Sequence, residues 1–315
     1  MSSPAASARV VGYLGPPGTF TEAALHTQPD LAALELRAMG SIPDVLMAAG
    51  SGEIDYGFVA IENAIEGSVT LTTDTLAFDT DLLIQREVTM RVQLNLMARP
   101  GVELGDITRV VSIPVATAQC RHFLREKLPN ARTEAANSTA EAAQLVGQGG
   151  RPGTAAIAPA VAAALYGLDV VAGAIEDHPE NETRFVVVAR EGIPAPTGHD
   201  KTTIVCFQQA DRPGSLLAIL QEFAARAINL TKIESRPTKQ GLGDYCFAID
   251  FEGHVGDELV TDCLRDLRAK VADVKFIGSY PAAGAHGEAV RREAEATWRD
   301  ADRWVQGLRA SIADR

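Results

Sequence analysis

The sequence predicts an α/β protein with two domains, and three observations support this. Short apolar runs typical of strands alternate with helical patterns through the first 190 residues. The segment EGIPAPTGHDK at 191–201, with its prolines and glycines, interrupts this alternation and is interpreted as a linker. Beyond it the predicted order is strand, helix, strand, strand, helix, strand. A chain of 315 residues, 46% hydrophobic and 22% charged, has room for about two domains of roughly 150 residues each.

The first domain, 9–190, contains strands separated by helices. Helical patterns are clearest over 41–50 and 138–147. The β-like runs are RVVGYL (9–14), YGFVAIEN (56–63), RVVSI (109–113), TEAA (133–136), TAAIAP (154–159), DVVAGAI (169–175) and RFVVVAR (184–190).

The second domain, 202–280, is predicted to have the ferredoxin-like βαββαβ order. Its helices are expected over 216–227 and 257–270. Its strands are TTIVCFQ (202–208), NLTKIESRP (229–237), DYCFAIDFEG (244–253) and DVKFIGSY (273–280). A polar helical tail, 281–315, follows and should pack on its own domain or on a second chain through the apolar stripe of Ala294, Trp298, Ala301, Val305, Leu308 and Ile312.

Composition argues against several classes of protein. The four cysteines lie far apart and the six histidines are scattered, so neither a disulfide framework nor a metal site is expected. A formal net charge of -12 disfavours nucleic acid and acidic membrane surfaces as partners. Residues 1–8 lack the features of a signal peptide and no apolar run reaches a membrane span, which predicts a cytoplasmic protein.

The stretch GYLGPPGTFTEAAL, 12–25, resembles a phosphate-binding turn in outline only. A P-loop requires a lysine after its second glycine, and the stretch contains none. It remains either a plain strand-to-helix turn or a small-anion site, with free backbone amides at a helix that begins at Thr19.

Polar side chains follow several other strands of the first domain. Since ligands collect at the carboxyl ends of strands in α/β sheets, these residues are candidates for binding, and the alternative for each serine or threonine is a helix N-cap. The candidates are Glu62, Asn63 and Ser68 in AIENAIEGSV, Ser112 and Gln119 in SIPVATAQC, and Asn137, Ser138 and Thr139 in ANSTAEAA.

Thr183 and Arg184 begin the strongly apolar strand in NETRFVVV. The arginine is either an edge residue whose head reaches water or an anchor for a carboxylate, which the guanidinium fork suits.

Taken in order, GYLGPPGTFTEAAL, IENAIEGSV, SIPVATAQC, NSTAEAA and ETRF resemble the catalytic domain of prephenate dehydratases. DRPGSL and ESRP resemble the ACT regulatory domain of the same family. The resemblance covers about residues 9–280 and implies two α/β lobes, as in type II periplasmic binding proteins, with the active site in their cleft. It further implies conversion of prephenate to phenylpyruvate, carbon dioxide and water in phenylalanine synthesis, with no cofactor or metal.

The resemblance also implies roles for individual residues. Asn63, Ser112, Gln119 and Thr183 match the family's catalytic positions, and the implied substrate contacts are Arg184, Phe185, Thr19, Ser68, Ser138 and Thr139. Asn137 stands where some members have a glutamate, which puts a carboxylate role there in doubt.

Prephenate is a dianion that loses carbon dioxide and a ring hydroxyl as the ring becomes aromatic. An enzyme must position it and assist departure of the hydroxyl without stabilising the departing carboxylate too well. We therefore expect Arg184 to pair with the pyruvyl carboxylate and Thr183 to donate a hydrogen bond to the leaving hydroxyl.

The ACT resemblance implies inhibition by L-phenylalanine, bound between two subunits of a homodimer or homotetramer. The implied effector site comprises Asp211, Pro213, Gly214, Ser215, Leu216, Asn229, Leu230, Glu234, Ser235, Arg236 and Pro237. Two alternatives remain open at this point: an arogenate dehydratase, or an amino-acid sensor without catalytic activity.

Overall fold

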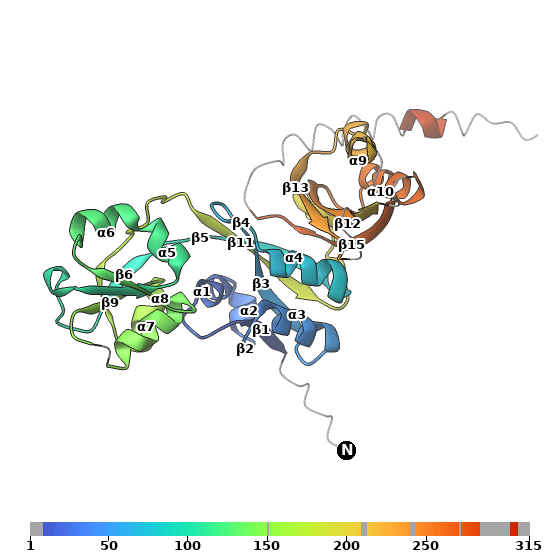
Figure 1. The fold of residues 1–315 in the computed structure, drawn as a ribbon. Coiled ribbons are helices and arrows are strands. Elements are labelled where there is room, and N and C mark those ends of the chain that lie inside the picture. The colour runs from blue at the N-terminus through green and yellow to red at the C-terminus, as the bar shows by residue number, and fades with distance from the viewer. Residues whose placement is uncertain are drawn as a thin grey trace, which may run out of the picture. The chain divides into compact units, whose positions relative to one another are not determined.

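The computed structural model describes residues 9–149, 151–208, 213–239, 244–270, 272–283 and 303–307. The chain divides between Glu191 and Gly192 into two compact units, and Leu83–Arg86 groups with the second. The first unit holds two α/β lobes, and residues 200–281 of the second form one four-stranded sheet with two helices (Figure 1). In the parts of the chain described, no helix combines the length and the apolar composition that crossing a membrane requires.

The first lobe is built on a sheet of order β2-β1-β3-β11-β5, with β4 paired to β3. Strands β1, β2 and β3 are parallel, whereas β11 runs antiparallel to β3 because it returns from the other lobe. The strands are β1 (Val10–Leu14), β2 (Glu35–Met39), β3 (Tyr56–Asn63), β4 (Gly67–Ser68), β5 (Leu83–Arg91) and β11 (Glu182–Ala189). The helices are α1 (Phe20–His26), α2 (Pro29–Ala32), α3 (Ile42–Ser51), α4 (Thr70–Asp74) and the π-helical turn η1 (Thr75–Asp79).

The second lobe repeats this order, since its sheet reads β8-β7-β9-β6-β10. Again three strands are parallel, and the fourth in the row, β6, is an antiparallel strand that arrives from the other lobe. The strands are β6 (Asn95–Ala98), β7 (Arg109–Ser112), β8 (Arg132–Ala135), β9 (Thr154–Ala158) and β10 (Asp169–Ala172). The helices are α5 (Pro114–Gln119), α6 (Arg121–Lys127), α7 (Thr139–Gly147), α8 (Ala160–Tyr166) and the short 3-10 turn η2 (Leu104–Asp106).

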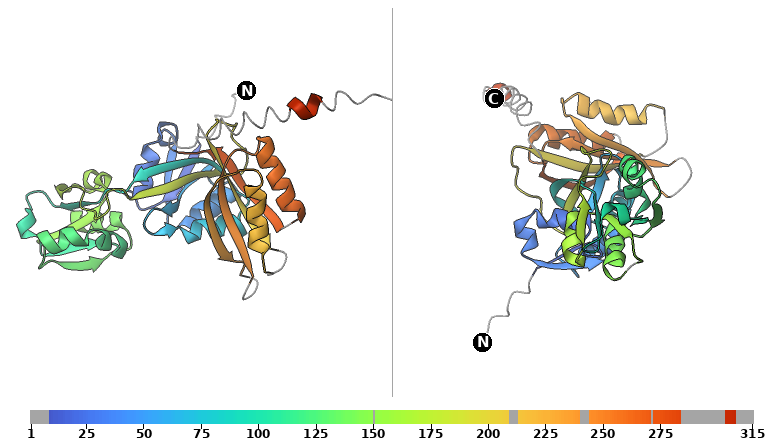
Figure 2. Two further views of the ribbon diagram at one scale, coloured as in Figure 1. Left: turned by 90° about the horizontal axis from the view of Figure 1, so that it is seen from above. Right: turned by 90° about the vertical axis from the view of Figure 1, so that its left-hand side faces the viewer.

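Two chain segments join the lobes, one from β5 to β6 and one from β10 to β11 (Figure 2). They are hydrogen-bonded to each other: the Val92 amide donates to the Asn181 carbonyl at 2.8 Å, and the Ile175 amide donates to the Leu94 carbonyl at 2.9 Å. The Leu94 amide also donates to the Glu176 carboxylate at 2.8 Å. The two segments that join the lobes are therefore held together by hydrogen bonds.

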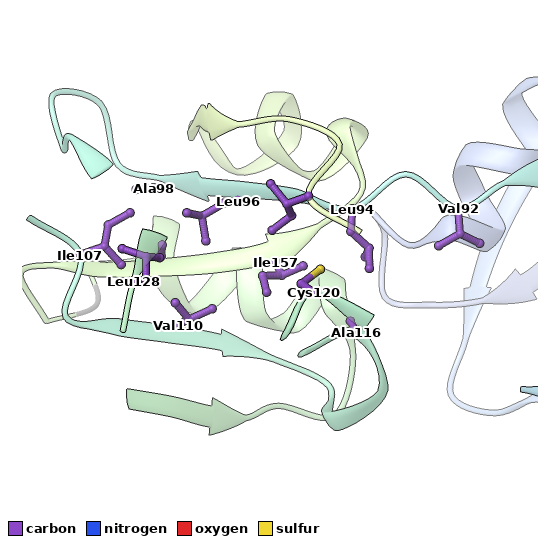
Figure 3. Close-up of a cluster of buried hydrophobic side chains, with 12 residues drawn as sticks. Val92, Leu94, Leu96, Ala98, Ile107, Val110, Ala116, Cys120, Leu128 and Ile157 are labelled. Carbon is purple, nitrogen blue, oxygen red and sulfur yellow. The ribbon is translucent and has the colours of Figure 1, made fainter. Parts of the chain in front are cut away.

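The core of the second lobe fixes the helix that carries Gln119. Ala116 and Cys120, one helical turn apart, pack against Ile157 at the centre of the sheet (Figure 3). Burial, with smaller contributions from Glu176 and Asp177, raises the pKa of the Cys120 thiol to about 12, so the thiol is neutral. All four cysteines are buried and reduced, as the sequence predicts.

The second unit has the expected βαββαβ order and an antiparallel sheet, β13-β14-β12-β15. Its elements are β12 (Asp200–Gln208), α9 (Ser215–Ala224), β13 (Leu230–Pro237), β14 (Tyr245–Glu252), α10 (Glu258–Lys270) and β15 (Ala272–Pro281). β13 lies at the edge of this sheet. The α/β class and the ferredoxin-like order are thus confirmed.

Two boundaries differ from the expected ones for local reasons. β12 begins at Asp200, inside the segment interpreted as linker, because the Asp200 carboxylate accepts from the amides of Thr197 and Gly198 and closes a turn. α9 ends at Ala224 because Ala227 has φ 53, a left-handed conformation that a helix cannot include. Of the apolar stripe expected in the tail, Val305 is described, in the helical segment 303–307; the other stripe residues lie outside the described residues.

Candidate active site

Thr183 and Asn63 face each other on paired strands. Thr183 of β11 is the register partner of Asn63 of β3, and Asn63 Nδ2 donates to Thr183 Oγ1 at 2.9 Å. The Asn63 Oδ1 atom accepts from the amides of Ile65 and Glu66, each at 3.0 Å. Because these two bonds fix which end of the amide is oxygen, the NH₂ group of Asn63 must point toward Thr183.

This arrangement determines what the Thr183 hydroxyl can do. Its oxygen accepts from Asn63, and among the described residues no acceptor lies within hydrogen-bonding distance of its proton. The side chain is half-buried, so a ligand can reach it. Thr183 can therefore donate a hydrogen bond to a ligand while it accepts one from Asn63.

Asn181 belongs to the same cluster, although sequence reasoning did not select it. Its side chain is 1% exposed. Asn181 Oδ1 accepts from Asn63 Nδ2 at 3.0 Å, and Asn181 Nδ2 donates to Gln119 Oε1 at 3.2 Å. The asparagine stands directly before the ETRF motif, but nothing in the sequence indicates that this polar side chain is buried.

Gln119 brings the second lobe into this cluster. It is the last residue of α5, and its carbonyl accepts from the Asp177 amide at 2.6 Å. Since Gln119 Oε1 is held by Asn181, its Nε2 faces away and donates to the Glu66 carboxylate at 3.3 Å. Three of the four predicted catalytic residues thus meet, together with Asn181 and Glu66.

Ser112, the fourth, does not join them. It is fully buried at the end of β7, and its hydroxyl donates to the Ile157 carbonyl at 2.7 Å. The hydroxyl proton of Ser112 is thus used inside the lobe, and the catalytic role expected for Ser112 stays a prediction. The structure gives Ser112 a part in holding β7 to β9.

Thr19 lies in the turn that leads into α1 and acts as its N-cap, with Thr19 Oγ1 accepting from the Glu22 amide at 3.3 Å. The Glu22 carboxylate in turn accepts from the Tyr13 hydroxyl at 2.9 Å and the Gly18 amide at 2.5 Å. Burial, and then the Glu22 carboxylate, raise the pKa of Tyr13 above its ordinary value. The turn is therefore rigidly tied.

The same turn contacts the second lobe. The Tyr166 hydroxyl of α8 donates to the Pro17 carbonyl at 2.7 Å. A Cβ placed on Gly18 would lie 3.1 Å from Tyr166 Cε2 and 3.5 Å from the Ala140 Cβ of α7. Thr19 and the start of α7 consequently lie on facing segments of the two lobes.

At that start, Ser138 and Thr139 behave as a helix N-terminus. The Ser138 hydroxyl accepts from the Glu141 amide at 2.9 Å, and Thr139 is buried. The Glu141 carboxylate accepts from the Asn137 amide at 2.6 Å. A carboxylate therefore stands beside Asn137, contributed by the next turn of the helix.

Arg184 lies on the opposite face of β11 from Thr183, because neighbouring strand residues alternate. Arg184 Nη1 is 3.2 Å from Glu62 Oε2, and Arg184 Nε is 3.3 Å from Glu87 Oε1. Ser68 is the register partner of Glu62 and shares that face. Two carboxylates therefore offset the charge of Arg184 on the face away from Thr183, and the expected contact with substrate stays a prediction.

Phe185, for which a role in substrate binding is expected, lies in the core of the first lobe. It is 1% exposed, and its ring stacks on Phe58 with centroids 5.4 Å apart. A ring enclosed in the core of the first lobe has no free surface for a ligand. Its contribution is to hold β11 against β3, and thereby Thr183 against Asn63.

The predicted effector residues of the second unit fall on two segments. Gly214, with φ 90, is the N-cap of α9, followed by Ser215 and the 36%-exposed Leu216; Pro213 precedes it in a turn. Asn229 precedes the edge strand, its carbonyl accepting from the Glu252 amide at 3.0 Å. The residues on that strand are Leu230, Glu234, Ser235, Arg236 and Pro237, with Glu234 paired to Arg236 at 3.5 Å. Asp211 lies outside the described residues.

Within the described ranges, no group of three or more histidine, cysteine, aspartate or glutamate side chains is arranged to hold a metal ion. The cluster around Thr183 consists of neutral amides and hydroxyls, with Glu66 at its exposed end. Such a cluster can orient a ligand and donate hydrogen bonds to it.

Comparisons with known proteins identify the family of the chain. Residues 11–193 match the family model for prephenate dehydratase, and residues 202–269 match the ACT domain. A prephenate dehydratase of Mycolicibacterium gilvum is 41% identical over 310 residues, covering 95% of this chain and 98% of that protein.

Two solved structures are similar over most of the chain. A prephenate dehydratase from Arthrobacter aurescens in complex with L-Phe has a TM-score of 0.84 and 40% identity, with 96% of this chain and 100% of that chain covered. GqqA, described as a quorum quenching acylase, has a TM-score of 0.77 and 27% identity over 87% of this chain and 98% of that one. The family match and the near-full-length relatives show that this chain belongs to the prephenate dehydratase family and carries its ACT domain.

Proposed function

We propose that this chain converts prephenate to phenylpyruvate, carbon dioxide and water in the cytoplasm, as a step of phenylalanine synthesis. One observation carries the proposal: Thr183 accepts a hydrogen bond from Asn63 at 2.9 Å and keeps its own proton for a ligand. The relative from Mycolicibacterium gilvum, named a prephenate dehydratase and 41% identical, supports the same reaction.

The residues of the cluster suit the needs of this elimination. Loss of carbon dioxide sends an electron pair into the ring, the C–O bond breaks, and the hydroxide that leaves takes up a proton to become water. Thr183 donates a hydrogen bond to that oxygen, and Asn63, by donating to Thr183, strengthens the bond. The neutral amide of Gln119 can bind the substrate without holding the departing carboxylate as a cation would.

The cluster gives less support to the acylase activity named for GqqA. Hydrolysis of an amide by a threonine or serine needs an adjacent base to remove the hydroxyl proton. Thr183 is bonded by an amide NH₂, which cannot accept a proton, and Ser112 is buried and bonded to a carbonyl. We therefore favour the elimination.

We also propose that L-phenylalanine inhibits the enzyme by binding at α9 and β13 between two copies of the second unit, in a homodimer or homotetramer. β13 lies at the edge of its sheet, so a strand of a second chain can pair with it. Alternate residues of β13 are exposed, among them Ile233 at 45%. The Arthrobacter aurescens structure contains L-Phe, which supports this effector.

The test is a direct assay of the purified chain with prephenate, following phenylpyruvate, with and without L-phenylalanine. We expect turnover that L-phenylalanine suppresses, and a mass in solution of two or four chains. Turnover of arogenate but not prephenate would make the chain an arogenate dehydratase. A folded protein that turns over neither would favour a sensor, and a monomer indifferent to L-phenylalanine would refute the proposed regulation.

A further inference from the structure

We propose that Asn181 is a positioning residue that relays the fixed amide orientation of Asn63 to Gln119, and so couples donors contributed by the two lobes. The inference rests on the proposed function, because it concerns how that reaction's donors are aimed. Asn181 itself is 1% exposed and therefore acts through its neighbours.

The two side-chain hydrogen bonds of Asn181 run in opposite directions. An asparagine side chain has one accepting end and one donating end. Asn181 uses its oxygen to accept from Asn63 at 3.0 Å and its nitrogen to donate to Gln119 at 3.2 Å. Since the Ile65 and Glu66 amides already fix the Asn63 amide, the bond from Asn63 sets the orientation of the Asn181 amide, and Asn181 in turn determines that the oxygen of Gln119 faces it.

For Gln119 the consequence is that its oxygen faces inward and its NH₂ group faces outward. In this structure the outward NH₂ group donates to Glu66 at 3.3 Å, at the exposed side of the cluster. A glutamine free to rotate its amide by half a turn would present a carbonyl oxygen there instead, which repels the carboxylates of a dianionic substrate. Asn181 holds the donor outward.

Asn181 is well placed for this task because its backbone is tied to both crossing segments. Its amide donates to the His178 carbonyl at 3.1 Å, and its carbonyl accepts from the Val92 amide at 2.8 Å. A buried amide with both ends bonded and its backbone fixed cannot reverse without leaving polar groups unpaired. The orientation of the Asn181 amide is therefore fixed by the two segments that join the lobes.

Asn181→Asp tests this directly, since the shape is kept and the donor is removed. The carboxylate still accepts from Asn63 but cannot donate to Gln119, so the Gln119 amide turns and presents its oxygen to the substrate. We expect kcat/KM at pH 8 to fall by roughly 100-fold, the loss typical of one misplaced donor. As the pH falls, the carboxyl group of the variant becomes protonated and can donate to Gln119 again. After correction for the uncatalysed reaction, kcat/KM of the variant should therefore rise toward low pH. The pH profile of the unmodified chain should lack this rise, which is called the new pH limb below.

Two controls separate positioning from general damage. Asn95→Asp alters a comparable buried asparagine of β6, whose side chain bonds the Gln93 carbonyl and the Ala174 amide only, and it should not create the new pH limb. In a Gln119→Ala background, Asn181→Asp should cost less than a quarter of its effect on the unmodified chain. Equal losses in both backgrounds, or the absence of the pH limb, would overturn the proposal.

A second readout does not depend on turnover. In the full chain labelled with ¹⁵N at asparagine and glutamine, the side-chain NH₂ resonances of Asn63 and Gln119 should titrate together in the Asn181→Asp protein with one midpoint, and should stay constant in the unmodified chain. If the unmodified chain does not act on prephenate, the proposed function fails while this titration still decides the inference. Resonances that do not move refute it.

Discussion

Thr183 Oγ1 lies 2.9 Å from Asn63 Nδ2, its register partner on the neighbouring strand. Because Thr183 Oγ1 accepts this hydrogen bond from Asn63, its own proton can be donated to a ligand. Thr183→Val keeps the shape and β-branching and removes the hydroxyl, so we expect kcat to fall about 10²- to 10³-fold with the fold intact. Steady-state kinetics with prephenate, beside a circular dichroism spectrum, measure this.

Thr183→Ser is the matched variant, because it keeps the hydroxyl that Asn63 bonds. It should retain most of the turnover. Full activity in the valine variant would remove Thr183 from the mechanism and leave it a strand residue.

Sequence patterns located these two residues because polar side chains at strand ends are visible in a single chain. The patterns also predicted the order of the second unit, whose strands alternate or run apolar. They missed β5, whose sequence LIQREVTMR has no clean period, because it lies at the edge of its sheet. They missed Asn181 because burial of a polar side chain depends on the return of the chain from the other lobe.

Arg184 illustrates a different limit. A guanidinium before an apolar strand suggests an anion site. The register of β11 on β3 determines which anion Arg184 contacts, because it places Arg184 opposite Glu62. The sequence contains both residues 122 positions apart, and no local pattern joins them. Ser112 and Phe185 were likewise predicted as site residues from local sequence, and their burial depends on how the sheets assemble.

The ion pairs of Arg184 predict an effect on stability. Glu87 is 2% and Arg184 10% exposed in their side chains, so Arg184→Met takes a cation away from a buried carboxylate that lies 3.3 Å from it. We expect the free energy of unfolding to fall by about 3–5 kcal/mol, measured by urea denaturation. Adding Glu87→Gln should recover part of this loss, and a double variant no more stable than the single one would contradict the pairing.

Kinetics of Arg184→Lys distinguish the structural role from the expected substrate contact. Lysine keeps the charge but loses the fork that reaches two carboxylates. If Arg184 supports β11, the variant should be less stable while its KM for prephenate changes little. A KM raised tenfold or more in a protein of unchanged stability would place Arg184 on the substrate.

Gly18 predicts a loss of activity that arises from packing between the lobes. Its φ is 92, and a Cβ would press on Tyr166 at 3.1 Å, displacing the ring whose hydroxyl bonds Pro17. Gly101 has φ 82 with nothing within 4 Å of a Cβ, so alanine there has the same backbone cost without the clash. Gly18→Ala should lower kcat/KM, whereas Gly101→Ala should lower stability alone; equal kinetic effects would show that the clash is irrelevant.

Ala227 predicts a stabilising change at the end of α9. With φ 53 it occupies a conformation that costs L-residues about 1–2 kcal/mol, and Ala227→Gly relieves it against a smaller entropic loss. We expect a net gain of about 0.5–1 kcal/mol in the free energy of unfolding. Ala225, also exposed and with φ -62, is the control. Ala225→Gly should lower the free energy of unfolding by about as much as Ala227→Gly raises it. A lower free energy of unfolding in both variants would show that Ala227 is not strained.

Cys120 predicts how stability depends on alkaline pH. Its thiol has a pKa of about 12 in the folded chain, raised by burial and then by Glu176 and Asp177, against 9.0 as the ordinary value. Between these values the folded state binds the proton and the unfolded state releases it, so stability is full below pH 9 and declines as the pH rises toward 12. This thiol alone contributes a slope of about -1.4 kcal/mol per pH unit in that window. Urea denaturation of the unmodified chain and of Cys120→Ala at pH 8, 9 and 10 isolates the contribution of this thiol. The alanine variant should lose less stability than the unmodified chain between pH 9 and 10. Equal losses would mean that the Cys120 thiol is as exposed in the folded chain as in the unfolded chain.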